Sequence, residues 1–181
     1  HYDYEMSKIF FDELDLPNPM INLEVGSGSH AWQTAEIMQR LEGTVVNSKP
    51  HAVMVPGDTN STLAGALVAT KLYYTVAHVE AGARSYDLKM PEEVNRKLTD
   101  HCSKLLFTPT KNCQNNLNKE GIPKDQIFLV GDTMYDSLKR HLPATTKSRI
   151  LDKLDLETEN YCLITLHRPE NVDDEMKLKT I

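Results

Sequence analysis

The stretch of residues 53–96 constrains the fold more than any other part of the chain. It contains two short apolar runs, residues 53–55 and 75–79, and each run ends in a polar turn. An amphipathic segment rich in Ala and Gly, residues 63–72, separates the two runs. Short apolar runs that alternate with helical segments are typical of a parallel β-sheet with crossover helices. We therefore predict an α/β fold with Rossmann-like parallel sheets.

The same alternation continues along the rest of the chain. Strands are predicted at residues 52–56, 74–79, 104–107, 127–130 and 161–166. Helices are predicted at residues 2–14, 30–47, 63–72, 111–119, 134–142 and 148–156, and a further helix begins at Pro91. Ser29 and Thr110 are the expected N-caps of two of these helices, and Gly121 is expected to end one of them.

Two burial patterns follow from the apolar positions. The strand at residues 52–56 is apolar without alternation, so we expect both of its faces to be covered. In the helix that begins at Pro91, an apolar stripe is expected to face the core. Its members are Val94, Leu98, Cys102 and Leu105.

A linker is predicted at residues 143–146, where Pro, Ala and two Thr residues interrupt the pattern. We therefore predict two domains, at residues 1–143 and 144–181. The chain opens on a helix, so the first domain is expected to lack its first strand. The second is expected to be only the beginning of another Rossmann-like domain, including its linker.

Composition excludes several classes of function. The formal net charge of -6 argues against a nucleic-acid-binding protein, because phosphate contacts need clustered Lys and Arg. No apolar run approaches the roughly 20 residues of a membrane span, and no signal-peptide pattern opens the chain. The three cysteines form no C-x-x-C pair and suggest reduced thiols. We expect a cytoplasmic protein without a membrane or nucleic-acid partner.

Polar residues follow four of the predicted strands. They are Asp58, Glu80, Asp132 and His167. In open α/β sheets, ligands bind at the carboxyl ends of the strands. An imidazole and several carboxylates at one edge suit proton transfer. Asp58 alone could be only a helix cap, whereas Glu80, followed by Ala-Gly, has no evident structural task. His78 is expected to be packed in the core or against the sheet.

The helix that begins at Pro91 carries further candidates. Pro suits the first helical position, and Glu92 and Glu93 match the helix dipole in the first turn. Polar residues spaced three and four apart are neighbours on the helix surface, so they can contact one ligand or pair with each other. On this helix they are Glu92, Asn95, Arg96 and Thr99.

Several short motifs occur in a fixed order along the chain. They are Gly57-Asp58-Thr59, His78-Val79-Glu80-Ala81-Gly82, Pro91-Glu92-Glu93-x-Asn95-Arg96, Thr99-Asp100, Glu120-Gly121-Ile122 and His167-Arg168-Pro169-Glu170-Asn171. H-V-E-A-G followed by P-E-E-x-N-R is highly specific. The set resembles the non-hydrolysing UDP-N-acetylglucosamine 2-epimerases of bacterial and archaeal type, over nearly the whole chain.

This resemblance implies a two-domain architecture of the glycosyltransferase-B type, with the sugar nucleotide in the cleft between the domains. The family's G-T-R-P-E segment is absent, as is most of its second domain, so the architecture is expected to be incomplete at both ends. The resemblance also implies a homodimer, with UDP-N-acetylglucosamine as the substrate and as an allosteric activator.

The implied activity is interconversion of UDP-N-acetylglucosamine and UDP-N-acetylmannosamine, without a cofactor or metal. The C2 proton is removed and UDP is eliminated to give a 2-acetamidoglucal intermediate, and UDP then adds back with a proton delivered to the other face of C2. Asp58, Glu80 and Glu92 match the family's three cleft carboxylates. His167 matches the histidine on the diphosphate side, where Arg168 is expected to help. Asn95 and Arg96 are expected to bind the substrate.

Three alternatives stay open. A metal-dependent phosphoesterase could use Asp58, His78, His101 and His167, although these histidines lack ligand-type spacing. A non-catalytic module could bind UDP-sugars, although the three carboxylates are intact. The protein could also be an epimerase of a more decorated UDP-amino sugar, the kind of substrate on which some members of that family act. Gly131-Asp132-Thr133 replaces the commoner G-N-T, which alters the hydrogen bonding expected at that strand end.

Overall fold

The computed structural model describes residues 7–166 and 169–181. It contains two compact units, residues 1–140 and 141–181. The boundary between Arg140 and His141 lies just before the linker expected at residues 143–146, and the assignment of domains stays a prediction. None of the helices in the described ranges combines the length and the apolar character needed to cross a membrane.

The first unit is built on a four-stranded parallel sheet, as predicted. Its strands lie in the order β1 (Ala52–Pro56), β2 (Thr75–Val79), β3 (Leu105–Thr108) and β4 (Ile127–Leu129). One row of paired residues crosses the whole sheet and is buried. The row is Val55, His78, Leu106 and Ile127. Neighbours in register point to the same face of a sheet, so this face is the one that helices cover.

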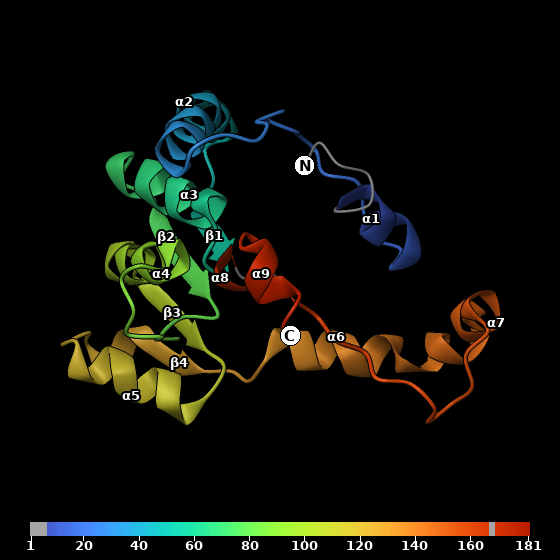
Figure 1. The fold of residues 1–181 in the computed structure, drawn as a ribbon. Coiled ribbons are helices and arrows are strands. Elements are labelled where there is room, and N and C mark those ends of the chain that lie inside the picture. The colour runs from blue at the N-terminus through green and yellow to red at the C-terminus, as the bar shows by residue number, and fades with distance from the viewer. Residues whose placement is uncertain (1–6, 167–168) are drawn as a thin grey trace. The chain divides into compact units, whose positions relative to one another are not determined.

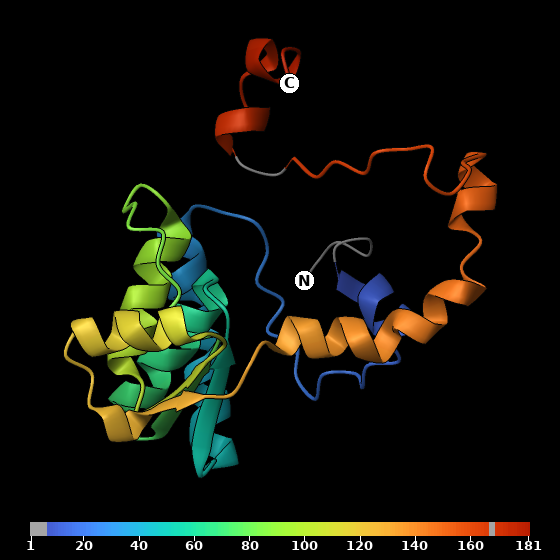
Figure 2. The ribbon, with the colours of Figure 1, turned by 90° about the horizontal axis from the view of Figure 1, so that it is seen from below.

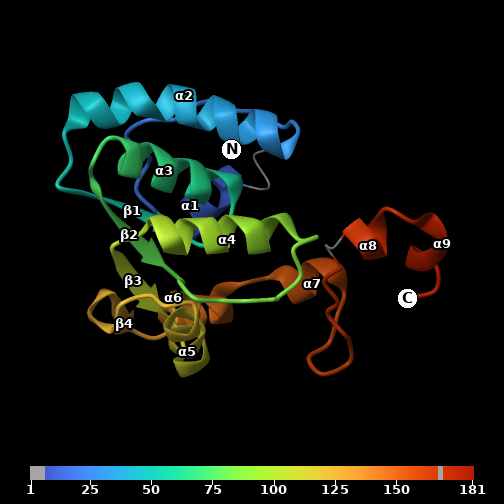
Figure 3. The same ribbon diagram turned by 90° about the vertical axis from the view of Figure 1, so that its left-hand side faces the viewer.

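Three crossover helices connect the strands, and all lie on that face (Figure 1). They are α3 (Asn60–Lys71), α4 (Pro91–Cys102) and α5 (Lys111–Lys119). A right-handed crossover that always moves to the next strand in one direction returns the chain to the same face each time. The helix α2 (His30–Ser48) packs on α3, as Figure 3 shows, and Figure 2 shows the sheet and its helices from below.

Small residues let α3 approach the sheet closely. Ala66 and Ala69 form one core cluster with Val55 and Val76. A Cβ atom added at Gly65 would lie 3.0 Å from a methyl group of Val55, so a larger residue here would push the helix outward. A second cluster lies under α5 and contains Ala81, Leu106, Leu117 and Ile127.

The predicted helix ends are confirmed. Ser29 accepts a hydrogen bond from the N–H of Trp32 and caps α2, and Thr110 accepts one from Cys113 and caps α5. Gly121 follows α5 with a φ of +83°, in the left-handed region that favours glycine. These ends could be predicted because a cap depends on residues within one helical turn.

Two predicted burial patterns are wrong. Met54 of β1 is 64% exposed, because successive strand residues point to opposite faces and the crossover helices α3, α4 and α5 cover the face of Val55. On α4, Val94 and Leu98 are exposed. The buried residues of α4 are polar instead: Glu93, Asn95, Thr99 and Asp100.

The remaining helices are short, and one of them, η2 (Lys124–Gln126), directly precedes β4. The others, in chain order, are α1 (Ile9–Glu13), α6 (Thr133–His141), η3 (Leu142–Lys147), α7 (Ile150–Leu154), α8 (Pro169–Val172) and α9 (Glu175–Leu178). The strand predicted at residues 161–166 does not form, and Leu163 is 88% exposed there. A strand needs a partner strand to satisfy its backbone groups, and the described part of this unit contains none.

Candidate active site

The ends of neighbouring strands meet at one small hollow of about 160 Å³. Asp58 follows β1, Glu80 follows β2, and both line the hollow together with Arg96 of α4. The other lining residues are Gly57, Ala83, Pro109, Asp132 and Met134. The structure thus brings together three predicted strand-end carboxylates, Asp58, Glu80 and Asp132, and one predicted binding residue, Arg96. A larger hollow of about 860 Å³ lies beside α2, and none of the predicted site residues lines it.

Glu80 adopts an unusual backbone conformation. Its φ is +69°, in the left-handed region that residues with a Cβ rarely occupy. Its carboxylate accepts a hydrogen bond of 3.2 Å from the hydroxyl of Thr133. Such local strain persists where the surrounding structure imposes it, and it is concentrated at functional sites.

Asp58 forms an ion pair with Arg96, at 2.6 Å between Oδ2 and Nη2. It does not cap α3, because Thr59 is the residue that accepts a hydrogen bond from Thr62 at the first turn. The alternative in which Asp58 is only a helix cap is therefore wrong. The side chain of Asn95 donates to the backbone carbonyl of Asp58 at 2.9 Å, so Asn95 supports this turn from α4.

Glu93, beside the predicted Glu92, holds the loop that follows Glu80. Its side chain is 0% exposed, and it accepts hydrogen bonds from the N–H groups of Ser85 and Tyr86 and from the Ser85 hydroxyl. Arg96 donates to it as well, at 3.0 Å, and so bridges Glu93 and Asp58. Burial alone would raise the pKa of Glu93, but these hydrogen bonds and the charge of Arg96 outweigh it and lower the pKa.

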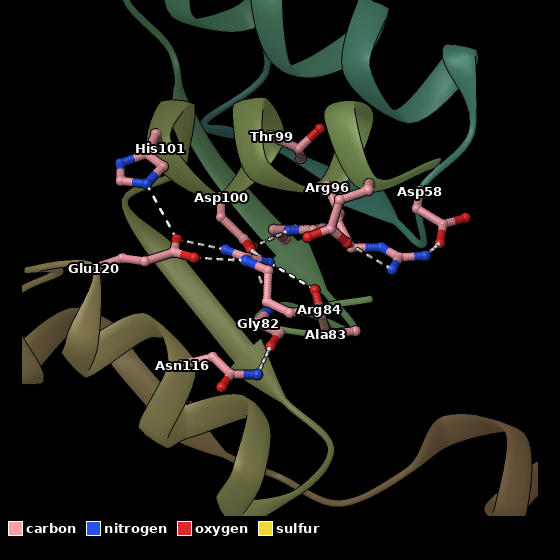
Figure 4. A network of polar contacts seen from close by, with 12 residues as sticks. Asp58, Gly82, Ala83, Arg84, Arg96, Thr99, Asp100, His101, Asn116 and Glu120 are labelled. Atoms are coloured by element: carbon pink, nitrogen blue, oxygen red, sulfur yellow. Dashed lines mark hydrogen bonds and ion pairs between the residues drawn. The ribbon is translucent and has the colours of Figure 1, made fainter. Parts of the chain in front are cut away.

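Asp100, two turns farther along α4, holds the beginning of the same loop (Figure 4). It is fully buried and accepts hydrogen bonds from the N–H of Gly82 and from Arg84. Arg84 lies between Asp100 and Glu120 and makes two contacts of 2.7 Å with the Glu120 carboxylate. These hydrogen bonds from Arg84 lower the pKa of Glu120 against the opposing effect of its partial burial.

Close packing fixes the loop at Gly82. Its φ is +82°, and a Cβ atom added there would lie 2.4 Å from the backbone oxygen of Cys113. Asn116 of α5 donates to the Gly82 carbonyl and accepts from the Tyr86 hydroxyl. Buried or half-buried partners therefore hold the backbone of residues 82–86. This loop follows Glu80 directly, so these contacts also help to fix the position of Glu80.

The other predicted residues lie elsewhere or are not described. Glu92 is exposed on the first turn of α4 and does not line the hollow. His167 and Arg168 lie outside the described residues. Sequence reasoning missed the roles of Glu93 and Asp100, although their spacing of seven residues places them on one helix face with Arg96.

The metal-dependent alternative finds no support in this geometry. Both ring nitrogens of His78 are occupied by contacts with Asp100 and Gly57, and Asp58 is paired with Arg96. His101 lies at the other end of the buried network, beside Glu120. Within residues 7–166 and 169–181, no three side chains of His, Cys, Asp or Glu are grouped closely enough to hold a metal ion.

Comparison with known proteins identifies the family. A family model described as UDP-N-acetylglucosamine 2-epimerase matches residues 1–181. The chain belongs to the UDP-N-acetylglucosamine 2-epimerase family. The resemblance carried by the H-V-E-A-G and P-E-E-x-N-R motifs is thereby confirmed.

Two similar proteins support this family assignment. A UDP-N-acetylglucosamine 2-epimerase homolog of Methanococcus maripaludis is 54% identical over all of this chain and 51% of its own length. A UDP-2,3-diacetamido-2,3-dideoxy-D-glucuronate 2-epimerase of Pseudomonas aeruginosa is 44% identical over all of this chain and 51% of its own length.

A solved structure of the family has the same fold. It is the Methanocaldococcus jannaschii UDP-GlcNAc 2-epimerase in complex with UDP-GlcNAc and UDP, and the TM-score is 0.91 at 50% identity. The alignment covers 99% of this chain and 50% of that protein. The chain thus spans about half the length of the relatives it matches.

Proposed function

We propose that this chain forms the proton-transferring part of an enzyme that interconverts UDP-N-acetylglucosamine and UDP-N-acetylmannosamine. The observation that carries the proposal is the meeting of Asp58, Glu80 and Arg96 in one hollow at the carboxyl ends of neighbouring parallel strands. Membership of the epimerase family, whose Methanocaldococcus jannaschii member was solved with UDP-GlcNAc, supports the choice of substrate.

The reaction needs groups of this kind. The C2 proton of the sugar is not acidic, because no carbonyl group is conjugated with it, so its removal requires a carboxylate close to C2 and help for the departing UDP. Inversion at C2 requires proton transfer on two faces. Among the described residues, the Thr133 hydroxyl is the side chain that donates a hydrogen bond to the Glu80 carboxylate, which keeps acceptor capacity for such a proton.

Arg96 and Asp58 act as a pair in this proposal. The ion pair of 2.6 Å fixes the Asp58 carboxylate, and Glu93 fixes the guanidinium from the other side. Asn95 holds the backbone of the same turn and so contributes to substrate binding indirectly. Glu92, exposed where α4 begins, completes the catalytic set that the resemblance predicts.

The size of the hollow limits what this part of the enzyme holds. Sites for small molecules usually measure about 300–1,000 Å³, and the hollow measures about 160 Å³. We therefore assign the amino sugar to it. His167 and Arg168, which the resemblance assigns to the diphosphate, lie outside the described residues. The cytoplasmic location, the homodimer, the activation by substrate and the absence of a cofactor belong to the same proposal.

A second candidate substrate is a more decorated UDP-amino sugar. The Pseudomonas aeruginosa relative, at 44% identity over the whole chain, is named for a diacetamido glucuronate sugar. The two substrates share the C2 acetamido carbon at which the carboxylates would act, so the same residues suit both.

The test is to incubate the full-length protein encoded by the gene with UDP-N-acetylglucosamine in heavy water and to follow the sugar by proton NMR. We expect loss of the C2 proton signal together with formation of the manno product. Glu80→Gln should lower the rate by about 100-fold or more, whereas His101→Gln, a change on the exposed side of the network, should leave it unchanged.

Two results would contradict the proposal. An unchanged C2 signal with substrate shown to be bound would exclude epimerisation of this sugar, and the diacetamido sugar would be tested next in the same assay. Binding of both sugars without exchange of either C2 proton would indicate a non-catalytic UDP-sugar-binding module.

A further inference from the structure

The buried histidine of β2 links the two strand ends that carry the site. His78 is 0% exposed, and its Nδ1 lies 2.6 Å from Oδ1 of Asp100. Its Nε2 lies 2.8 Å from the backbone carbonyl oxygen of Gly57, the residue before Asp58. The two ring nitrogens therefore face a carboxylate on one side and a carbonyl on the other.

The two partners of the His78 ring, the Gly57 carbonyl and the Asp100 carboxylate, both require a hydrogen-bond donor. A carbonyl oxygen can only accept a hydrogen bond, so Nε2 carries a proton. Asp100 already accepts at Oδ2 from the N–H of Gly82 and from Arg84, which indicates a charged carboxylate. Its Oδ1 can then only accept as well, so Nδ1 must also carry a proton.

The charges of the buried cluster agree with this assignment. Buried Asp100 and partly buried Glu120 bring two negative charges, and buried Arg84 brings one positive charge. Half-exposed His101, 3.2 Å from Glu120, is in contact with solvent and lies outside the buried cluster. A second positive charge on His78 makes the cluster neutral, which is the condition for burying ionised groups at tolerable cost. We propose that His78 is held as a doubly protonated imidazolium and acts as a positioning residue for Asp58, a role that rests on the proposed function.

The positioning acts through the Gly57 peptide. Its N–H donates to the carbonyl of Val79 at 3.0 Å, and its carbonyl accepts from His78. Both partners belong to β2, the strand that delivers Glu80 two residues after His78. Gly57 has a φ of +69°, so its turn depends on these contacts rather than on regular structure. His78 thereby fixes Asp58 relative to Glu80.

This arrangement predicts which substitutions can replace the histidine. The amide of a glutamine at position 78 offers one donor and one acceptor, so with Asp100 ionised it cannot serve both partners. With His78→Gln and Asp100→Asn together, the asparagine amide donates to the glutamine oxygen, and the glutamine amide donates to Gly57. The asparagine oxygen still accepts from Gly82 and Arg84.

The first measurement is direct and independent of activity. Nitrogen-15 NMR of the imidazole rings in the full-length protein, with the His78 signals assigned from the His78→Gln spectrum or from contacts with Gly57, should show directly bonded protons on both ring nitrogens. In Asp100→Asn, Nδ1 should lose its proton while Nε2 keeps it. A pyridine-type nitrogen in wild-type His78 would overturn the proposal.

The second measurement is kinetic. His78→Gln should lower kcat on the order of 100-fold, the loss expected when a reacting group moves by about 1 Å, with little change in KM. The double variant His78→Gln/Asp100→Asn should recover most of this loss, because it restores both hydrogen bonds.

His101→Gln is the matched control, because half-exposed His101 contacts the same network at its outer end, 3.2 Å from Glu120, and the variant should keep wild-type kcat. A double variant no better than His78→Gln would refute the positioning role. An inactive wild-type enzyme would instead refute the proposed function, and the NMR result would still decide the protonation of His78.

Discussion

The carboxylates of α4 and of the strand ends form two groups that differ in their surroundings. Glu93 and Asp100, on the inner face of α4, are fully buried, and each accepts hydrogen bonds from at least one backbone N–H group and from an arginine. Glu80 lines the hollow and accepts a hydrogen bond from the Thr133 hydroxyl, and Glu92 is exposed on the first turn of α4.

This contrast teaches which carboxylates stabilise the fold and which can act on a substrate. A buried carboxylate that already accepts several hydrogen bonds within the protein is closed off from a substrate proton, and its removal leaves several donors unsatisfied. A partly exposed carboxylate contributes little to stability and keeps its acceptor capacity. The proposed active site therefore consists of partly exposed carboxylates that can act on a substrate, held in place by buried carboxylates that bind the surrounding backbone and arginines.

The largest expected difference in the free energy of unfolding is between substitutions of two adjacent glutamates, one from each group. Glu93→Gln should lower the free energy of unfolding by about 3 kcal/mol or more, because it breaks a buried ion pair and turns an amide N–H₂ toward backbone donors. Glu92→Gln, one residue away, should change it by less than about 1 kcal/mol, the value of a surface charge at a helix N-terminus. Urea unfolding of the two variants measures the difference, and equal losses would remove the distinction.

A smaller effect of opposite sign is expected at Glu80. Its left-handed backbone conformation is unfavourable for a residue with a Cβ, so Glu80→Gly should raise the free energy of unfolding by up to about 1 kcal/mol. The same variant should lose epimerase activity. Glu80→Gln keeps the strain and serves as the control, inactive but no more stable than the wild type. A destabilised Glu80→Gly variant would show that the carboxylate supports the fold.

The smallest expected effect is the pH dependence of stability. The pKa of Glu93 is lowered in the folded protein, so the unfolded chain binds protons more readily and stability falls as pH drops below the ordinary glutamate range. The stabilisation is complete above about pH 5 and is lost on acidification toward the folded pKa. Protonation removes the charge but leaves the side chain in place, so the loss is smaller than in Glu93→Gln.

Urea unfolding at several pH values compares the wild type with Glu93→Gln. The difference between the two should shrink as pH falls, because protonated Glu93 and glutamine are both neutral. Glu120, whose pKa is also lowered, should retain its contribution in both proteins. A difference that stays constant down to pH 3 would show that the charge of Glu93 does not contribute to stability.

Local features of the fold could be predicted from the sequence. The four strands of the sheet and the caps at Ser29 and Thr110 follow from short-range patterns, because strand periodicity and cap chemistry involve only a few neighbouring residues. The strand expected at residues 161–166 was wrong because its apolar run has no partner strand in the described residues. The placement of Asp58 and Glu80 at one edge followed from the polarity of a parallel sheet.

By itself, the sequence determined the family, the parallel sheet and the strand ends at which the candidate carboxylates gather, since each of these depends on local pattern or on ordered motifs. The tertiary structure alone decided that Glu93 rather than Val94 faces inward, and that His78 joins Asp100 to the Gly57 turn. Neighbouring helix residues point in directions about 100° apart, and which of them meets the sheet is set by the rotation of the packed helix. That rotation depends on contacts between distant segments, which no local pattern records.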